Sequence, residues 1–128
     1  MFSFVIWDKK NKELFGVRDR FGIKPFHYYL DHEKFIWASE IKSLSVIDGI
    51  DKALNIKSLD YYFAYGHSKP DSTIYNNVRK LPPGCYFHIK HKEDYKITIK
   101  RYWEINIRPD HGKTETYWKE KLYNTVNE

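Results

Sequence analysis

The stretch GVRDRFGIKPFHYY, residues 16–29, combines opposite charges with two residues that restrict the backbone. Arg18 and Asp19 are adjacent, and Gly22 and Pro25 follow in the same loop. Neighbouring strand residues point to opposite faces, so Arg18 and Asp19 each need a partner of their own. A partly buried guanidinium has several N–H donors in a fixed fork and can hold several loop carbonyls at once. The pattern predicts a structural scaffold loop and not a reacting centre.

Cys85 is the single thiol of the chain and therefore the candidate nucleophile for covalent catalysis by sulfur. His27, His88 and His91 are the candidate bases for it. Cys85 directly follows the turn LPPG at 81–84, however, where a small apolar residue is the ordinary occupant. We predict a packing role for Cys85 and no catalytic one.

Metal and disulfide chemistry find little support in the sequence. One cysteine excludes an internal disulfide framework. The six histidines lack the spacing of a metal site: His88 and His91 are three apart in a strand or turn context, which points their rings to different faces. We predict no metal ligands in this chain.

The composition excludes two further classes of function. Aromatic residues make up 18% of the 128 residues, which indicates a folded chain because disordered segments are poor in them. The net charge of +5 is spread along the sequence without the basic block of a nucleic-acid arm. No apolar run approaches the roughly 20 residues that a membrane span needs. The sequence predicts neither nucleic-acid binding nor membrane insertion.

Alternation and turn residues predict mostly antiparallel strands. Residues 2–8 and 13–19 form one predicted hairpin, and residues 26–31 and 35–39 form a second, which together predict a four-stranded meander. The first strand is apolar almost throughout, so we expect it to be a central strand, buried on both faces, whose missing neighbours leave an unpaired edge. Residues 84–104 add a further antiparallel pair after an irregular segment.

Three segments have helical periodicity. The first covers about 40–47, with Ser39 as its N-cap and Glu40 in its first turn. The second covers about 56–65 and stops at Gly66. The last, 114–128, is amphipathic.

Five blocks of the sequence occur together in one known family. In this order and at compact spacing, they resemble the glutamine-hydrolysing asparagine synthetases; the blocks are FSFVIWD, RDRFGIKPFHYY, FIWASEIKSL, TIYNNVRKLPPGCY and RYWEI. The resemblance implies an α+β fold: part of an N-terminal-nucleophile hydrolase sandwich, mainly antiparallel sheet with flanking helices. Residues 1–108 would be a partial class II glutamine amidotransferase domain. Residues 109–128 would be the linker and first helix leading to an ATP-dependent synthetase domain.

The sequence departs from that family at the residues that carry the chemistry. The family has a cysteine after its initiator methionine, and this chain has Phe2 there. The glutamine-binding segments would precede Met1, and the nucleotide-binding loop would follow Glu128. We therefore expect a fragment with no catalytic residue of its own, inactive alone. A thiol, oxyanion donors and a carboxylate are all needed for glutamine hydrolysis.

The resemblance also implies the setting of this fragment. It places the loop of residues 18–25 and the segment after residue 38 near the junction of the two domains. The scaffold and interdomain candidates are thus Arg18, Asp19, Gly22, Pro25, Ser39 and Glu40. No cofactor is expected in this chain, whereas the full-length enzyme would use ATP and Mg with glutamine and aspartate. The expected partners are the missing N-terminal half, the synthetase domain and a second copy in a homodimer, in the cytoplasm.

Two other functions stay open on the sequence. One is a relative that amidates another carboxylate, such as a sugar acid or a peptide, because the acceptor is chosen in the synthetase domain. The other is a remnant without catalysis that acts as a binding module. An RNA-binding module is a third class, but no RNP-like or OB-type pattern supports it.

Overall fold

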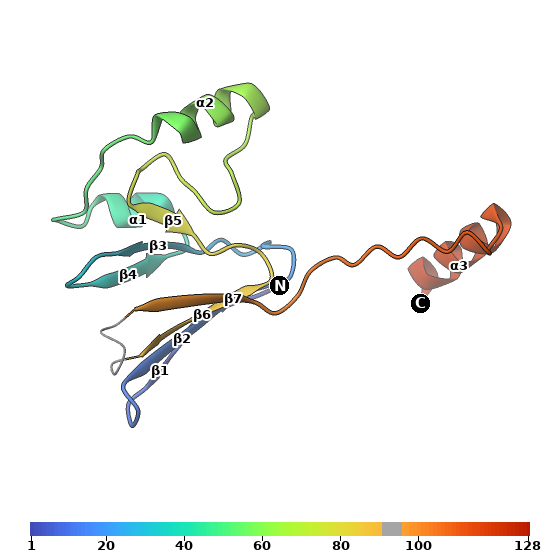
Figure 1. The fold of residues 1–128 in the computed structure, drawn as a ribbon, viewed down its shortest axis with the longest axis horizontal. Helices are drawn as coiled ribbons and strands as arrows, with labels where there is room; N and C mark the ends of the chain where they lie inside the picture. The colour runs from blue at the N-terminus through green and yellow to red at the C-terminus, as the bar shows by residue number, and fades with distance from the viewer. Residues whose placement is uncertain (91–95) are drawn as a thin grey trace.

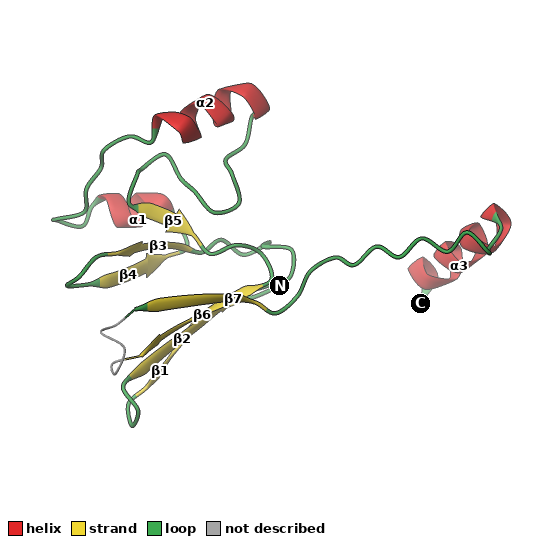
Figure 2. Ribbon diagram, in the orientation of Figure 1, coloured by secondary structure: helices red, strands yellow, loops and turns green. Residues whose placement is uncertain are grey.

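The computed structural model describes residues 1–90 and 96–128, which form a mixed fold of antiparallel strands and helices (Figures 1 and 2). In chain order the elements are β1 (Ser3–Asp8), β2 (Glu13–Arg18), β3 (His27–Leu30), β4 (Phe35–Ala38), α1 (Ile41–Ser45), α2 (Ile56–Tyr65), β5 (Val78–Lys80), β6 (Cys85–Lys90), β7 (Ile97–Arg101) and α3 (Glu115–Asn127).

The strands form two sheets, one of four strands in the order β1-β2-β6-β7 and one of three in the order β4-β3-β5. Every pairing is antiparallel, as predicted. The prediction of one four-stranded meander is wrong, because the two hairpins lie in different sheets. Residues far along the chain pair with each hairpin: β6 with β2, and β5 with β3. Strand β5 lies in the segment that was expected to be irregular.

Strand β1 is at the edge of the four-stranded sheet, and it is not buried on both faces as predicted. Phe4, Ile6 and Trp7 are between 44% and 55% exposed. Within the described residues β1 has a partner, β2, on one side only. The unpaired edge that the sequence predicted is therefore present.

The main core fills the space between the two sheets. Residues 85, 87 and 89 of β6 face inward and are almost fully buried, which follows from the two-residue period of a strand. They pack with Phe26, Tyr28 and Leu81. A second cluster lies between the three-stranded sheet and α1, and it consists of Tyr29, Leu44, Ile50 and Val78. The molecule is thus layered as sheet, sheet and helices (Figure 1).

Helices α1 and α2 confirm two predicted helices, with one error at a helix start. Ser39 is not the N-cap of α1; Glu40 takes that position and its side chain makes no cap hydrogen bond. Helix α2 begins after Asn55, whose side chain accepts a hydrogen bond from the N–H of Ser58 at 3.1 Å. It ends at Gly66 with φ 72°, the left-handed conformation that glycine adopts at low cost, as predicted.

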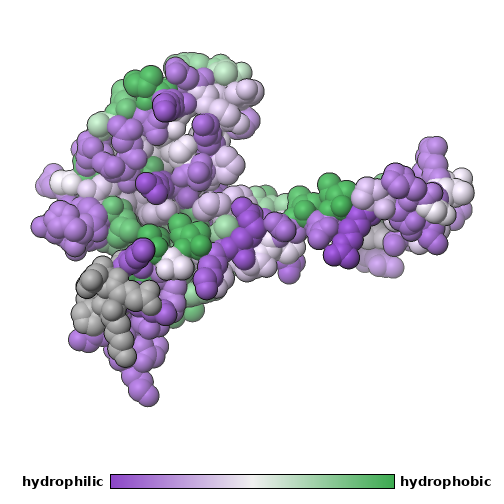
Figure 3. All heavy atoms as spheres, viewed as in Figure 1, coloured by the Kyte–Doolittle hydropathy of each residue, from purple (hydrophilic) through white to green (hydrophobic). Residues whose placement is uncertain are grey.

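Helix α3 lies apart from the sheets at the end of an extended segment (Figure 1). All of its residues are exposed, including Trp118 and Leu122. Apolar atoms also appear on the surface over α2 and along the extended segment (Figure 3), where Phe63, Ile105 and Ile107 are more than 60% exposed. Among the described helices, none has the length and apolar character to cross a membrane.

Gly16 of β2 leaves room for the ring of Phe87, its cross-strand partner on β6. A Cβ atom there would lie 2.1 Å from Cε1 of Phe87, whose side chain is fully buried. We predict that Gly16→Ala lowers the free energy of unfolding by about 1–3 kcal/mol, the usual cost of overpacking a core. Urea unfolding followed by circular dichroism measures this.

The matched control is Gly112→Ala, the same change in the exposed segment before α3, which should stay within about 0.5 kcal/mol of the wild type. In the double variant Gly16→Ala/Phe87→Leu the smaller side chain should relieve part of the clash, giving a non-additive effect. Additive losses would contradict a steric cause.

Candidate functional site

Arg18 holds together three separate carbonyls of the loop region. Its Nε donates to the carbonyl of Lys24 at 2.8 Å, Nη1 to that of Leu81 at 2.7 Å, and Nη2 to that of Gly22 at 2.7 Å. Burial lowers the pKa of the guanidinium, and attraction to Asp19 opposes this shift. The hydrogen bonds expected of a partly buried arginine are present, and they join the loop after β2 to Leu81, the first residue of the LPPG turn.

The Asp19 carboxylate is the anionic counterpart within the same loop. It is 4% exposed and accepts hydrogen bonds from the backbone N–H groups of Phe21 and Ile23 at 3.1 Å each, and of Lys24 at 2.9 Å. Burial opposes the charged form, but the backbone donors outweigh it, so the pKa of Asp19 lies below its ordinary value. Arg18 therefore binds loop carbonyls and Asp19 binds loop amides, and each has its own partners as predicted.

The backbone of Asp19 joins three segments of the chain. Its N–H donates to the carbonyl of Phe2 at 2.9 Å, and its carbonyl accepts from the N–H of Gly84 at 3.0 Å. Gly84 has φ 64°, and a Cβ there would lie 2.4 Å from the carbonyl oxygen of Trp103. The hydroxyl of Tyr102 donates to the carbonyl of Arg18 at 2.8 Å. The loop, the LPPG turn and the end of the four-stranded sheet thus form one hydrogen-bonded unit.

The sequence missed the residues that close this unit. Gly84, Tyr102 and Trp103 lie in two of the blocks that carry the family resemblance, but nothing local in them points to Arg18 or Asp19. The available signals were the glycine that ends the LPPG turn and the adjacent Tyr102 and Trp103 after a predicted strand. Only the pairing of β6 with β7 brings the two together.

Of the other predicted scaffold residues, two are in the unit and two are apart from it. Gly22 has φ 66° and lies against Pro83, with too little space for a side chain, and Pro25 belongs to the same loop. Ser39 and Glu40 follow β4 instead. The Ser39 carbonyl lies 3.0 Å from Nδ1 of His27 and the Glu40 carboxylate 2.8 Å from Nζ of Lys42.

Cys85 is packed inside the core. Its thiol is in a side chain that is 4% exposed, and burial raises the pKa of the thiol, so the reactive thiolate is disfavoured. His88 is on the opposite face of β6, where its Nε2 lies 3.0 Å from the Glu13 carboxylate. His27 contacts the carbonyl of Ser39, and His91 lies outside the described residues. The arrangement gives Cys85 a packing role.

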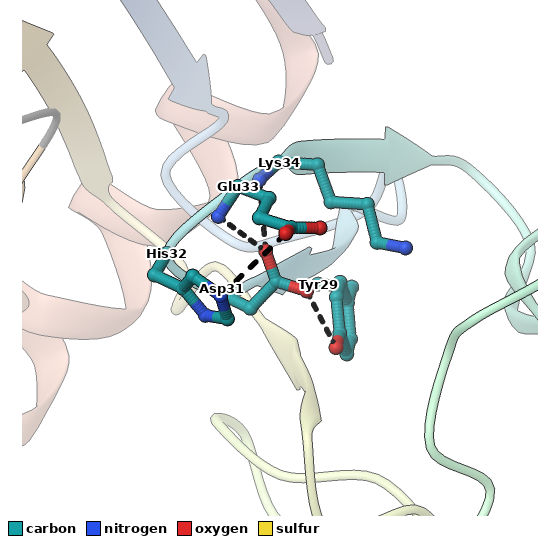
Figure 4. Close-up of polar contacts among 5 residues, drawn as sticks. All are labelled: Tyr29, Asp31, His32, Glu33 and Lys34. Atoms are coloured by element: carbon teal, nitrogen blue, oxygen red, sulfur yellow. Dashed lines mark hydrogen bonds and ion pairs between the residues drawn. The ribbon is translucent and has the colours of Figure 1, made fainter.

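The turn between β3 and β4 borders a cavity of about 220 Å³ that includes Trp7, Leu14 and Phe35 in its lining. Asp31, also in this lining, is a carboxylate that could act as an acid or base if it were free of other contacts (Figure 4). It accepts from the N–H groups of Glu33 and Lys34, both at 2.8 Å, and from the hydroxyl of Tyr29 at 2.9 Å. These hydrogen bonds, that from Glu33 first, lower the pKa of Asp31. Its lone pairs stabilise the turn, so the cavity has no free catalytic carboxylate in Asp31.

The part of the chain that the structure describes contains no cluster of three or more residues that could hold a metal ion. Nor do the described contacts join a nucleophile, a base and an oxyanion donor. What the site does chemically is to hold a loop in one conformation with two buried or half-buried charges.

Comparison with known proteins identifies the family. Residues 1–103 match the model of the glutamine amidotransferase domain, so the chain belongs to this family. It is 35% identical over 130 residues to asparagine synthetase [glutamine-hydrolyzing] 1 of Bacillus subtilis, and 37% identical over 133 residues to a putative asparagine synthetase [glutamine-hydrolyzing] 2 of Methanocaldococcus jannaschii. A further relative, 30% identical over 109 residues, is the amidase chry2 of Gibberella zeae.

These matches confirm the resemblance to glutamine-hydrolysing asparagine synthetases and cover nearly all of this chain: 99% for the Bacillus protein and 98% for the Methanocaldococcus protein. The same alignments cover 20% and 25% of those two relatives. The alignment with the amidase chry2 of Gibberella zeae covers 85% of this chain and 15% of that relative. The chain therefore corresponds to a small part of each relative, the amidotransferase part.

Replacing Arg18 by lysine tests the guanidinium fork. A lysine ammonium is compact and cannot reproduce three carbonyl contacts that lie in different directions. We predict that Arg18→Lys lowers the free energy of unfolding by about 2–4 kcal/mol, because carbonyls lose charge-assisted hydrogen bonds. Arg20→Lys, at the exposed neighbouring position, is the matched control and should have little effect. Equal stability of the two variants in urea would disprove the role of the fork.

Asp19→Asn should remove a pH-dependent contribution to stability. Because the folded-state pKa of Asp19 is lowered, its contribution is present above the unfolded-state pKa of about 3.9 and is lost as the pH falls through the lower folded-state value. We predict that the wild type is more stable than the variant at pH 7 and that this difference shrinks below about pH 4. Urea unfolding from pH 7 to pH 2.5 measures it.

The control for this series is Asp60→Asn, at an exposed position of α2. It should leave the stability of the chain close to that of the wild type over the same pH range. A difference between wild type and Asp19→Asn that does not depend on pH would show that the carboxylate charge is not what the loop amides require.

Proposed function

We propose that this chain is the C-terminal half of the glutamine amidotransferase domain of a glutamine-dependent asparagine synthetase. The observation that carries the proposal is the family match over residues 1–103 together with the alignment to named glutamine-hydrolysing asparagine synthetases. In this proposal the domain has the N-terminal-nucleophile hydrolase sandwich. The two packed antiparallel sheets and the helix layer on one of them support it.

The role we propose for the chain is structural. The hydrogen bonds of Arg18 and Asp19 would fix the loop 18–25 at the junction with the synthetase domain, next to the entrance of the ammonia path. This role is supported by the hydrogen bonds that both side chains make to the backbone of the loop and its neighbours. Residues 109–128 would lead toward the synthetase domain, which the separate position of α3 favours (Figure 1).

The whole protein would hydrolyse glutamine and pass the ammonia to ATP-activated aspartate in the cytoplasm. ATP and Mg would be held outside this chain, and the nucleophile of glutamine hydrolysis would come from the other half of the domain. The alternative is a relative that amidates another carboxylate; the same region also aligns with a protein that is not named an asparagine synthetase, the amidase chry2. The acceptor can be read only from the synthetase domain.

A chimera tests the proposed role directly. The segment of the Bacillus asparagine synthetase 1 that aligns with this chain is replaced by the chain itself, and glutamate release from glutamine is measured. We predict that the chimera hydrolyses glutamine and makes asparagine, and that Arg18→Lys reduces glutaminase activity by about tenfold to a hundredfold through misplacement of the site. Arg20→Lys should leave the activity close to that of the unmodified chimera.

Two further arms decide between scaffold and catalyst. The isolated chain should release no glutamate, and Cys85→Ala should not change the activity of the chimera, because the thiol is buried. A chimera that folds, as judged by circular dichroism and gel filtration, but does not hydrolyse glutamine would refute the proposal. So would activity in the isolated chain that disappears in Cys85→Ala.

A further inference from the structure

His27 and Lys80 lie directly opposite each other in the three-stranded sheet. The register of β3 and β5 pairs them, and in the next pair the N–H of Leu81 donates to the carbonyl of Phe26 at 3.1 Å. Hydrogen-bonded and non-hydrogen-bonded pairs alternate in an antiparallel ladder, so the His27–Lys80 pair is of the non-hydrogen-bonded kind. In such a pair the Cα atoms are about 4.5 Å apart and the side chains are closest. Both side chains also lie on one face of the sheet.

The ammonium of Lys80 holds the segment that returns from α2 to β5 (Figure 1). Its Nζ donates to the hydroxyl of Ser68 and, at 3.3 Å, to the carbonyl of Lys69. The backbone continues this contact, because the N–H of Lys80 donates to the carbonyl of Asp71 at 3.2 Å. Both the side chain and the backbone of Lys80 therefore hold residues 68–71 beside the edge strand β5.

The ring of His27 is next to one carbonyl and two cations. Its Nδ1 lies 3.0 Å from the carbonyl of Ser39; a carbonyl only accepts, so Nδ1 carries the hydrogen of the neutral ring. The charged groups that act on the ring are Lys80 of β5 and Arg18 of β2, and both are positive. Burial lowers the pKa of His27 most, the hydrogen bond to Ser39 opposes this, and the two cations lower the pKa further. The folded chain therefore favours the neutral ring.

The carboxylates on the elements around His27 have other partners. Glu40, which precedes α1, pairs with Lys42 at 2.8 Å. The carboxylate of Asp19 accepts from the amides of its own loop. Burial and Arg18 lower the pKa of Lys80, and Asp71 opposes this shift, so the charge of Asp71 acts on the lysine. Among the described groups that act on His27 there is thus no carboxylate to stabilise a protonated ring.

We propose that His27 and Lys80 form an acid-sensitive latch for residues 68–71. Histidine changes its charge near neutral pH, and like charges directly opposite each other destabilise a sheet. A proton on His27 sets a cationic ring against the Lys80 ammonium, which moves into water and gives up its contacts to Ser68 and Lys69. While the ring is neutral, the ammonium stays in place and the segment is held.

The direction of the pH dependence follows from the two states of the latch. In the released state His27 is in water and has the ordinary histidine pKa of about 6.5. In the held state the pKa of His27 is lower. As the pH falls, the released state therefore takes up a proton first, and the held state loses stability relative to it from about pH 6.5 downward. Above that range His27 is neutral in both states and the latch stays closed.

An NMR titration of the imidazole protons in the purified full chain tests the opposed charges. We predict that His27 titrates below about pH 6.5 and that Lys80→Met moves its titration to higher pH, because the cation opposite the ring is gone. The matched control is Lys57→Met, the same change at an exposed lysine of α2, which should leave the titration of His27 in place. His27→Gln identifies the signal. An unchanged titration in Lys80→Met would overturn the proposal.

Amide hydrogen exchange tests the release of the segment. The reporter is the N–H of Lys80, whose acceptor is the carbonyl of Asp71. Its exchange is measured relative to that of an unstructured peptide at the same pH, which gives a protection factor. We predict that this factor falls at least about threefold from pH 7 to pH 5 in the wild type, and by more than that of Phe87 in the central strand β6.

Two glutamine variants complete this experiment. His27→Gln keeps an N–H donor for the carbonyl of Ser39 but takes up no proton, so the protection of the Lys80 amide should no longer depend on pH. His32→Gln, the same change at an exposed position between β3 and β4, is the matched control and should respond as the wild type does. A wild type without the pH response, or an equal response in His27→Gln, would each contradict the latch.

Discussion

The fold depends on two charged side chains that are hydrogen-bonded by backbone groups at a single point. Arg18 binds three carbonyls and Asp19 binds three amides, at the place where the chain leaves one sheet for the other. The loop between the two sheets has no strand partner for its backbone groups, which need hydrogen bonds of their own. Two adjacent charged side chains solve this because they point in different directions and supply only donors and only acceptors, respectively.

This solution explains why the rest of the loop is so restricted. Gly22 has a positive φ and lies against Pro83, and Gly84 has a positive φ and lies against the backbone of Trp103. Side chains at these positions would separate the loop from the turn that it contacts. The Asp19 backbone then joins the loop to Phe2 at the start of the four-stranded sheet. The edge strand, the loop and the turn are thus joined by backbone hydrogen bonds.

The site groups of the described residues are committed to structure: the buried thiol of Cys85, the carboxylate of Asp31, and the charges of Arg18 and Asp19. Exposed apolar side chains remain on β1, α2 and α3. In the proposed function the reacting groups come from other parts of the protein, and this chain contributes structure.

The sequence by itself determined the local structure: the hairpins, helix α2 with its stop at Gly66, the packing role of Cys85 and the separate partners of Arg18 and Asp19. These follow from alternation, capping and donor geometry, which act over a few residues. Only the tertiary structure decided that the hairpins belong to two sheets and that Gly84 and Tyr102 complete the Arg18–Asp19 unit. Strand partners and loop contacts join residues as many as 84 positions apart. Such pairings are chosen by how whole faces fit together, so no local pattern records them.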